Sequence, residues 1–202
     1  MATFDAIYGL SNAIKRLIED NYPAGGGKVA VNVVQPTDIK ASSDGTTEGK
    51  ESFTVSLYRI SVSGTQNPQT ARKDDNGKLF RPSRLVDLHY LITPWATSTD
   101  RQHQMLGWLF NLIGDKGTLS SAQLNHVTAD AKIFGLLESV QLSYESMPLT
   151  EHFNLWEKLR NSGFSVSATC VARMVALDSM QPIDEPALVQ TRKFVGYQTE
   201  QA

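Results

Sequence analysis

Cysteine and long apolar runs are scarce in this chain of 202 residues, and each shortage excludes a class of protein. The one cysteine, Cys170, cannot close a disulfide within the chain, which favours a reducing compartment. The sequence has no apolar run of about 18 residues, so we expect no membrane-spanning helix. The residues after Met1 lack the basic region and apolar run of a signal peptide. These features predict a cytoplasmic protein that does not insert directly into a membrane.

Neither sign of charge dominates the composition. Lys and Arg together number 19 and Asp and Glu 21, which gives a net charge of −2. Nucleic acids and anionic membranes are bound by clustered positive charge, so we expect neither as a partner. The length suits one domain, and the hydrophobic share of 41% can fill its core without a disulfide or a metal.

The sequence lacks the common catalytic and metal-binding motifs. The run Gly25-Gly26-Gly27-Lys28 lacks the earlier glycine and the following Ser or Thr of a Walker loop. The four histidines form no metal-ligand pattern, and Cys170 lies on the apolar side of a predicted strand, where burial makes a thiol unreactive. We therefore expect no catalytic residue, no metal and no cofactor, and we do not expect an enzyme.

One pair of residues keeps a catalytic alternative open. Asp87 and His89 lie two residues apart in a predicted strand, so their side chains share one face and can touch. A nearby serine would complete a triad of the hydrolase type. The simpler interpretation, which we favour, is a polar network that supports a buried strand.

Hydrophobic periodicity predicts an α+β fold with a mostly antiparallel central sheet flanked by helices. The strand at 52–63 changes its apolar face midway, which indicates a bulge or a strand covered on both faces. The strand at 85–96 is apolar on both faces and is predicted to be central. Helices are expected at 4–21, 101–113 (capped by Asp100), 128–137 (Ile133, Leu136 and Leu137 inward) and 151–160 (Phe153, Trp156 and Leu159 inward); the other strands are expected at 28–35, 140–145 and 164–176.

Two long polar connections, 37–50 and 64–84, interrupt this pattern. Asp74 to Gly77 fails the spacing of a calcium loop and predicts a turn. The second connection is locally basic, which is typical of a solvated loop or of a contact surface for an acidic protein. Its basic residues are Arg72, Lys73, Lys78, Arg81 and Arg84.

The chain changes character near residue 178. Pro182 and Pro186 interrupt regular structure, and a strand-capable polar strip follows. We therefore divide the chain into an α+β core domain, residues 1–178, and an extended C-terminal arm, residues 179–202. The apolar members of the arm are Leu188, Val189, Phe194, Val195 and Tyr197.

Several segments together resemble one known family. The most specific segment is the run Leu-Val-Asp-Leu-His-Tyr-Leu-Ile-Thr-Pro-Trp-Ala at residues 85–96, supported by the runs at 155–159, 163–167 and 174–177 and by the order of the helix and strand before residue 35. This arrangement is similar to the tube and sheath terminator, or cap, of phage-tail-like contractile injection systems of the antifeeding-prophage and Photorhabdus virulence cassette type.

The resemblance implies a structural protein that forms a six-fold ring. Such a ring ends the inner tube and links it to the sheath at the end distal to the baseplate, and the particle assembles in the cytoplasm. The implied partners are further copies of the chain, the inner tube protein and the sheath protein. Another tail-completion or adaptor protein of the same particle, or a small soluble enzyme, remain the alternatives.

Two interface hypotheses follow. The arm pairs with an adjacent subunit or a sheath protein through Leu188, Val189, Phe194, Val195 and Tyr197, or else it packs on its own subunit. The basic connection meets the inner tube through Arg72, Lys73, Lys78 and Arg81.

Overall fold

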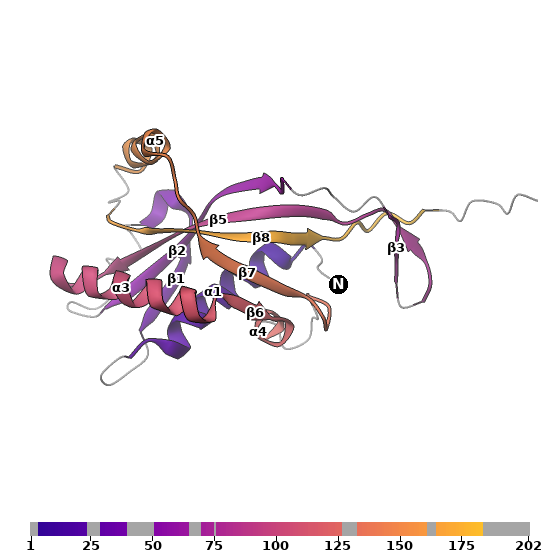
Figure 1. Cartoon of the computed structure of the whole chain (residues 1–202), viewed down its shortest axis with the longest axis horizontal. Coiled ribbons are helices and arrows are strands. Elements are labelled where there is room, and N and C mark those ends of the chain that lie inside the picture. Colours follow the sequence, from indigo (N-terminus) through magenta and orange to yellow (C-terminus); the bar gives the residue numbers. More distant parts are fainter. Residues whose placement is uncertain are drawn as a thin grey trace, which may run out of the picture.

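A computed structural model describes residues 4–23, 29–39, 51–64, 70–74, 76–126, 133–160 and 165–183. Helices flank a curled central sheet (Figure 1). The elements are α1 (Ala6–Asn21), β1 (Ala30–Val34), η1 (Pro36–Asp38), β2 (Ser52–Val62), β3 (Arg72–Lys73), β4 (Leu79–Phe80), β5 (Arg84–Trp95), α3 (Thr99–Lys116), β6 (Thr118–Ser120), α4 (Ser121–Asn125), β7 (Ser139–Tyr144), α5 (Leu149–Leu159) and β8 (Ala168–Leu177).

The main sheet has six strands in the order β1-β2-β5-β8-β7-β6. β1 runs parallel to β2, and every other neighbouring pair is antiparallel. The predicted α+β class with a mostly antiparallel sheet is confirmed. Helices lie on both faces of this sheet, so both faces of its middle strands can be buried.

β5 is the central strand that its apolar sequence predicts. Tyr90 and Ile92 face one side and Leu91 the other, and all three are buried. Pro94 lies opposite Phe53 of β2, but the ladder with β8 ends at Ile92, so no β8 residue lies opposite the proline.

β2 contains a bulge, which is one of the two explanations that its sequence leaves open. Its pairing with β5 skips Tyr58, because Leu57 lies opposite Tyr90 while Arg59 lies opposite His89. The extra residue moves the following side chains to the other face. This shift explains why the apolar pattern of the strand changes face midway.

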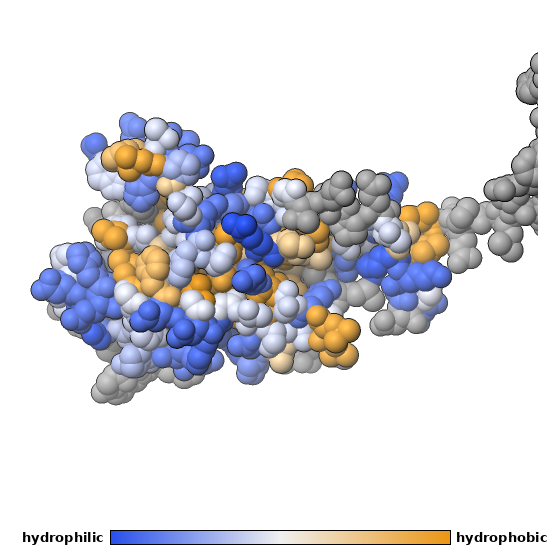
Figure 2. Space-filling model, viewed as in Figure 1, coloured by the Kyte–Doolittle hydropathy of each residue, from blue (hydrophilic) through white to orange (hydrophobic). Residues whose placement is uncertain are grey.

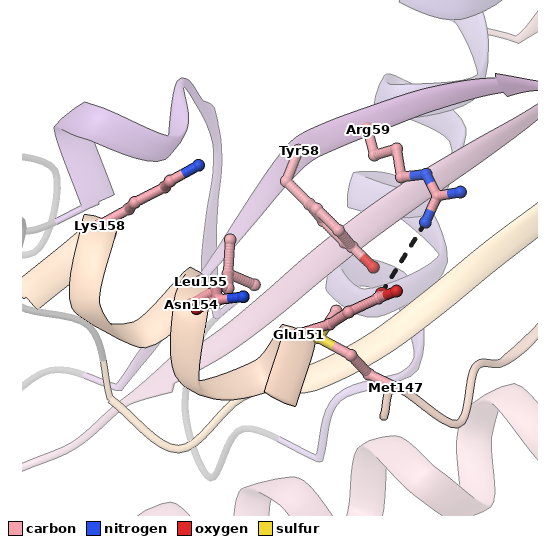
Figure 3. A pocket seen from close by; sticks show the side chains of 7 residues that line it. All are labelled: Tyr58, Arg59, Met147, Glu151, Asn154, Leu155 and Lys158. Carbon is pink, nitrogen blue, oxygen red and sulfur yellow. Dashed lines mark ion pairs between the residues drawn. The ribbon is translucent and has the colours of Figure 1, made fainter. Parts of the chain in front are cut away.

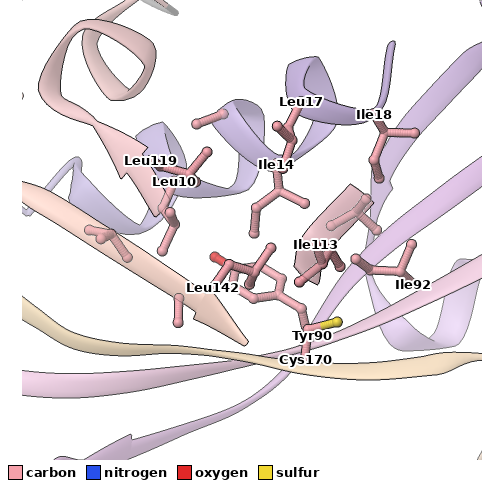
Figure 4. Close-up of a cluster of buried hydrophobic side chains, with 14 of the residues drawn as sticks. Leu10, Ile14, Leu17, Ile18, Tyr90, Ile92, Ile113, Leu119, Leu142 and Cys170 are labelled. Carbon is pink, nitrogen blue, oxygen red and sulfur yellow. The ribbon is translucent and has the colours of Figure 1, made fainter. Parts of the chain in front are cut away.

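The main core lies between the sheet and the helices α1, α3 and α4 (Figure 4). Leu10 and Ile14 of α1 and Leu109 of α3 have no exposed surface. The buried Tyr90 hydroxyl is satisfied by Ser11 Oγ at 3.0 Å, which joins β5 to α1 across the core. Cys170 lies in the same core, so its predicted burial is confirmed, and this burial raises the pKa of its thiol to about 12.

A smaller cluster covers the opposite face of the sheet. Ile39, next to η1, and Leu159 of α5 pack with Leu91 of β5. The prediction that Phe153 and Trp156 face inward is wrong, since these side chains are 58% and 46% exposed. α5 rests on the sheet along the line of Leu155 and Leu159, four residues apart, and the two aromatic rings lie away from that line.

The segment between α3 and β7 also differs from its prediction. The chain forms β6 and α4 there, and α4 carries a capping box formed by Ser120 and Gln123. Residues 133–138 make turns, and Leu136 and Leu137 are exposed, because the amide of Asn125 binds both the N–H and the C=O of Phe134 at 2.8 Å. The part of the expected helix at 127–132 lies outside the described residues.

α3 begins at a different cap from the predicted one. Ser98, rather than Asp100, accepts a hydrogen bond from the backbone N–H of Arg101 at 3.3 Å. Ser98 is extended, as a capping residue must be, whereas Asp100 already lies in the first turn of the helix. Among the described residues, no helix combines the length and the apolar character needed to cross a bilayer.

The packing gives a direct stability prediction. Leu109→Ala removes a fully buried side chain and should lower the free energy of unfolding by about 2–5 kcal/mol. Leu137→Ala, at a side chain that is 99% exposed, should change it by less than about 0.5 kcal/mol. Denaturant unfolding followed by circular dichroism measures both, and similar losses in the two variants would contradict the described core.

Candidate functional site

His89 lies at the centre of a chain of hydrogen bonds. Its Nε2 is 2.8 Å from Ser61 Oγ, and its Nδ1 is 2.7 Å from Glu145 Oε2. With the proton on Nδ1, the ring donates to Glu145 and accepts from the Ser61 hydroxyl. This connectivity is that of an acid–histidine–serine triad.

The acid in this chain is not the one that the sequence predicts. Asp87 Oδ1 accepts a hydrogen bond from the backbone N–H of Met174 at 2.9 Å. The ladder between β5 and β8 is irregular here, between Val86 and Leu88, and Met174 has a left-handed φ of 57°. Asp87 therefore stabilises a strained residue of β8, and no sequence spacing could have indicated Glu145, which is 56 positions from His89.

The surroundings of His89 favour a structural network. Tyr58 Oη also donates to Glu145, at 3.0 Å, and the backbone of Glu145 is held by Thr169. Burial, and then the Glu145 charge, raise the pKa of Tyr58. Ser61 lies within the extended β2, whereas serine nucleophiles are commonly presented on a sharp strand-to-helix turn. The network therefore fastens β2, β5 and the end of β7 to one another.

A pocket of about 200 Å³ lies beside this network, between β2 and α5 (Figure 3). An ion pair between Arg59 and Glu151, at 4.0 Å, crosses it. Its volume is below the range of about 300–1,000 Å³ that is usual for small-molecule sites. The lining residues are Tyr58, Arg59, Met147, Glu151, Asn154, Leu155 and Lys158.

The basic connection contains a small β-hairpin instead of remaining irregular throughout. β3 and β4 pair across a turn in which Asp74 Oδ1 accepts hydrogen bonds from the N–H groups of Asn76 and Lys78. Gly77 has a φ of 80°, which suits glycine. The predicted turn at 74–77 is confirmed, although Asp75 itself lies outside the described residues.

The chain beyond β8 packs against this hairpin. Ile183 N–H donates to Leu79 O at 2.9 Å, and Arg81 N–H donates to Gln181 O at 3.1 Å. Pro182 forms the bridge opposite Phe80. Residues 181–183 therefore pair with the edge of the hairpin through one bridge, at the end of the molecule that Figure 1 shows projecting beyond the helices.

Arg72 connects these pieces from within. Its guanidinium lies 4.9 Å from the centre of the Phe80 ring, and its Nε is 3.7 Å from Asp178 Oδ1. Asp178 also accepts a hydrogen bond of 2.5 Å from Ser83 Oγ. Arg72 is thus engaged with its own subunit. Lys73, Lys78 and Arg81 are exposed, although Lys78 Nζ also lies 5.7 Å from the centre of the Phe80 ring.

The five arm residues expected at an interface, Leu188, Val189, Phe194, Val195 and Tyr197, lie outside the described residues. Two exposed apolar surfaces were not predicted from the sequence. One follows α5 through Leu149, Phe153 and Trp156, and the other lies on the outer half of β2 at Ile60 and Val62. The helical spacing of the α5 residues was visible in the sequence, but it does not tell which side faces the sheet.

Comparison with known proteins identifies the family. A family model described as the Pvc16 N-terminal domain matches residues 9–191. The chain belongs to the Pvc16 N-terminal domain family. The match extends past residue 178, the predicted end of the core domain. No curated protein matches the chain at a significant level.

Two solved structures share the fold of this Pvc16 N-terminal domain. One is the PVC sheath/tube terminator of an extracellular contractile injection system in its extended state, with a TM-score of 0.60 and 16% identity over 96% of the chain. The other is the anti-feeding prophage cap, with a TM-score of 0.58 and 16% identity over 93% of the chain. The resemblance inferred from the sequence is confirmed. The chain spans 64% and 60% of the lengths of these two proteins.

The hairpin contacts predict different effects for two neighbouring basic residues. Arg72→Glu places a negative charge beside Asp178 and removes the nearer of the two cations over the Phe80 ring, Lys78 being the other. The backbone amides of Arg81 and Ile183 should then exchange with deuterium roughly fivefold faster, as for a loss of about 1 kcal/mol. Lys73→Glu, at an exposed side chain, is the matched control and should leave both amides unchanged. Equal exchange in the two variants would contradict the role given to Arg72.

Proposed function

We propose that the chain is a structural cap, or terminator, of a contractile injection system. The observation that carries the proposal is the fold shared over 96% of the chain with a sheath/tube terminator, together with this chain's membership of the Pvc16 N-terminal domain family. In this role the chain ends the inner tube, links it to the sheath at the end distal to the baseplate, and works without catalysis. Assembly takes place in the cytoplasm before the particle is released.

The proposed assembly is a homohexameric ring. A closed ring requires two different surfaces on each subunit that meet head to tail. The described residues provide separate candidate surfaces: the exposed aromatic side of α5, the basic hairpin, and the outer half of β2. Exposed apolar residues grouped in this way are typical of protein–protein contacts.

The proposal is tested on whole particles. Particles produced without this chain should have open or overlong inner tubes in electron micrographs, and the intact chain should restore a uniform length. Tubes of normal length without the chain would contradict the proposal. A tag on the chain that is seen at the baseplate end would instead indicate an adaptor protein.

Within this function, we propose that the basic hairpin meets the inner tube through Lys73, Lys78 and Arg81. Arg72 supports the same surface from within, since its partners Phe80 and Asp178 belong to its own subunit. The proposed surface is therefore three exposed cations on a hairpin that projects beyond the helical layer (Figure 1).

Charge reversal tests this contact. The triple variant Lys73→Glu, Lys78→Glu, Arg81→Glu should bind purified tubes at least about tenfold more weakly, because the contact then becomes repulsive, and it should still form rings. Lys158→Glu, an exposed lysine on α5, is the control and should bind tubes normally. Equal losses of ring formation and tube binding in the triple variant would contradict a hairpin surface that is specific for the tube.

A small hydrolase is the second candidate function, favoured by the hydrogen bonds that join Ser61, His89 and Glu145. A fluorophosphonate probe discriminates the two functions, because it labels an activated serine. Labelling of the intact chain that is lost in the Ser61→Ala variant would support the hydrolase. We expect no label, and we expect Ser61→Ala to cap tubes as well as the intact chain.

A further inference from the structure

β2 is longer than the strand that protects its outer edge. β1 pairs only with Ser52 to Ser56, whereas β2 continues to Val62. Along residues 57–62, the edge of β2 turned away from β5 has no strand partner among the described residues. We call these six residues the open edge. Uncovered edges are templates for an added strand, and natural proteins usually block them with lysine, proline or a bulge. Here a bulge lies at Tyr58, and Arg59 is the only charged residue.

The open edge has an apolar flank. Ile60 and Val62 are 51% and 71% exposed, although they lie opposite the buried Leu88 and Val86 of β5. Figure 2 shows an apolar surface in the region where β2 ends. An incoming strand with apolar side chains on one face would bury Ile60 and Val62 and satisfy the backbone groups of the edge.

We propose that the open edge binds the C-terminal segment 188–197 of a neighbouring copy of this chain. This inference rests on the proposed ring. Alternate residues of that segment are Val189, Thr191, Lys193, Val195 and Tyr197, so one side of an extended strand would be largely apolar or β-branched. Lys193 provides the one charge on that side.

The position of residues 181–183 favours pairing of the following segment with a neighbouring copy over pairing within the same subunit. Residues 181–183 are fixed to β4, beyond the end of the sheet (Figure 1). The segment that follows must reverse direction within about five residues to reach the edge of its own β2, which lies two strands away from β8. A neighbour placed ahead of the hairpin needs no such reversal. Donor segment and open edge are also different surfaces, which a closed ring requires.

Disulfide trapping tests the pairing. All variants carry Cys170→Ala, so that the buried native thiol takes no part. A tagged chain with Ile60→Cys is mixed with an untagged chain that carries Val189→Cys, Val195→Cys or Tyr197→Cys, and rings are assembled and oxidised. At least one of the three mixtures should give a disulfide between the two different chains. Met174→Cys replaces Ile60→Cys in the control, because Met174 is also 51% exposed, and it should give none.

Each outcome of the trapping has one meaning. A chain that carries both cysteines and closes only internal disulfides would show pairing within one subunit and overturn the inference. Disulfides to a sheath subunit carrying an engineered cysteine, in place of those between copies, would also overturn it. So would rings that form and cap tubes normally without any disulfide from Ile60→Cys, and that result would leave the proposed function intact.

Two further variants test the same contact without a thiol. Ile60→Lys blocks the edge at an exposed position, and a chain that ends at Ile183 lacks the donor segment but keeps the hairpin contacts. Each should assemble rings about tenfold more weakly than the intact chain, while its unfolding transition stays unchanged. Ring assembly at the normal concentration by either variant would overturn the inference.

Discussion

Burial of both faces of β5 is the constraint on which the rest of the structure depends. Tyr90 and Ile92 require a helical layer on one face, and Leu91 requires cover on the other. A strand that needs cover on both sides must also lie between two others, because its backbone groups cannot be hydrogen-bonded by water. β2 and β8 meet that need, and the helices α1 and α3 on one side and α5 on the other follow from it.

The two faces of the sheet are covered unequally, and this difference creates the surfaces of interest. The main core fills the space beneath α1, α3 and α4, whereas α5 touches the sheet along a narrow line of leucines. The long strands also continue past the helical layer. Their far ends support the hairpin at Arg72 and leave the open edge uncovered by β1. The proposed assembly surfaces therefore lie where the strands extend beyond the helices and β1 of their own subunit.

The polar network around His89 illustrates how a buried strand accommodates polar side chains. Ser61, Glu145 and Tyr58 satisfy the histidine and one another, and they join segments that are far apart in the sequence. Its resemblance to a catalytic triad is a matter of connectivity. The same contacts hold β2 and β7 to the central strand, as is expected of a fully hydrogen-bonded buried network.

The sequence by itself determined the class of fold, the central strand, the change of apolar face in β2 and the burial of Cys170, because each depends on local periodicity and composition. It also carried the family resemblance through the run at 85–96. Only the tertiary structure decided which side of α5 faces the sheet, that Glu145 rather than Asp87 binds His89, and that Arg72 turns inward. Those outcomes depend on contacts between segments that are distant in the chain. Local sequence spacing does not show which distant residue a side chain will contact. The open edge belongs with them, since it exists only because β1 is shorter than the strand beside it.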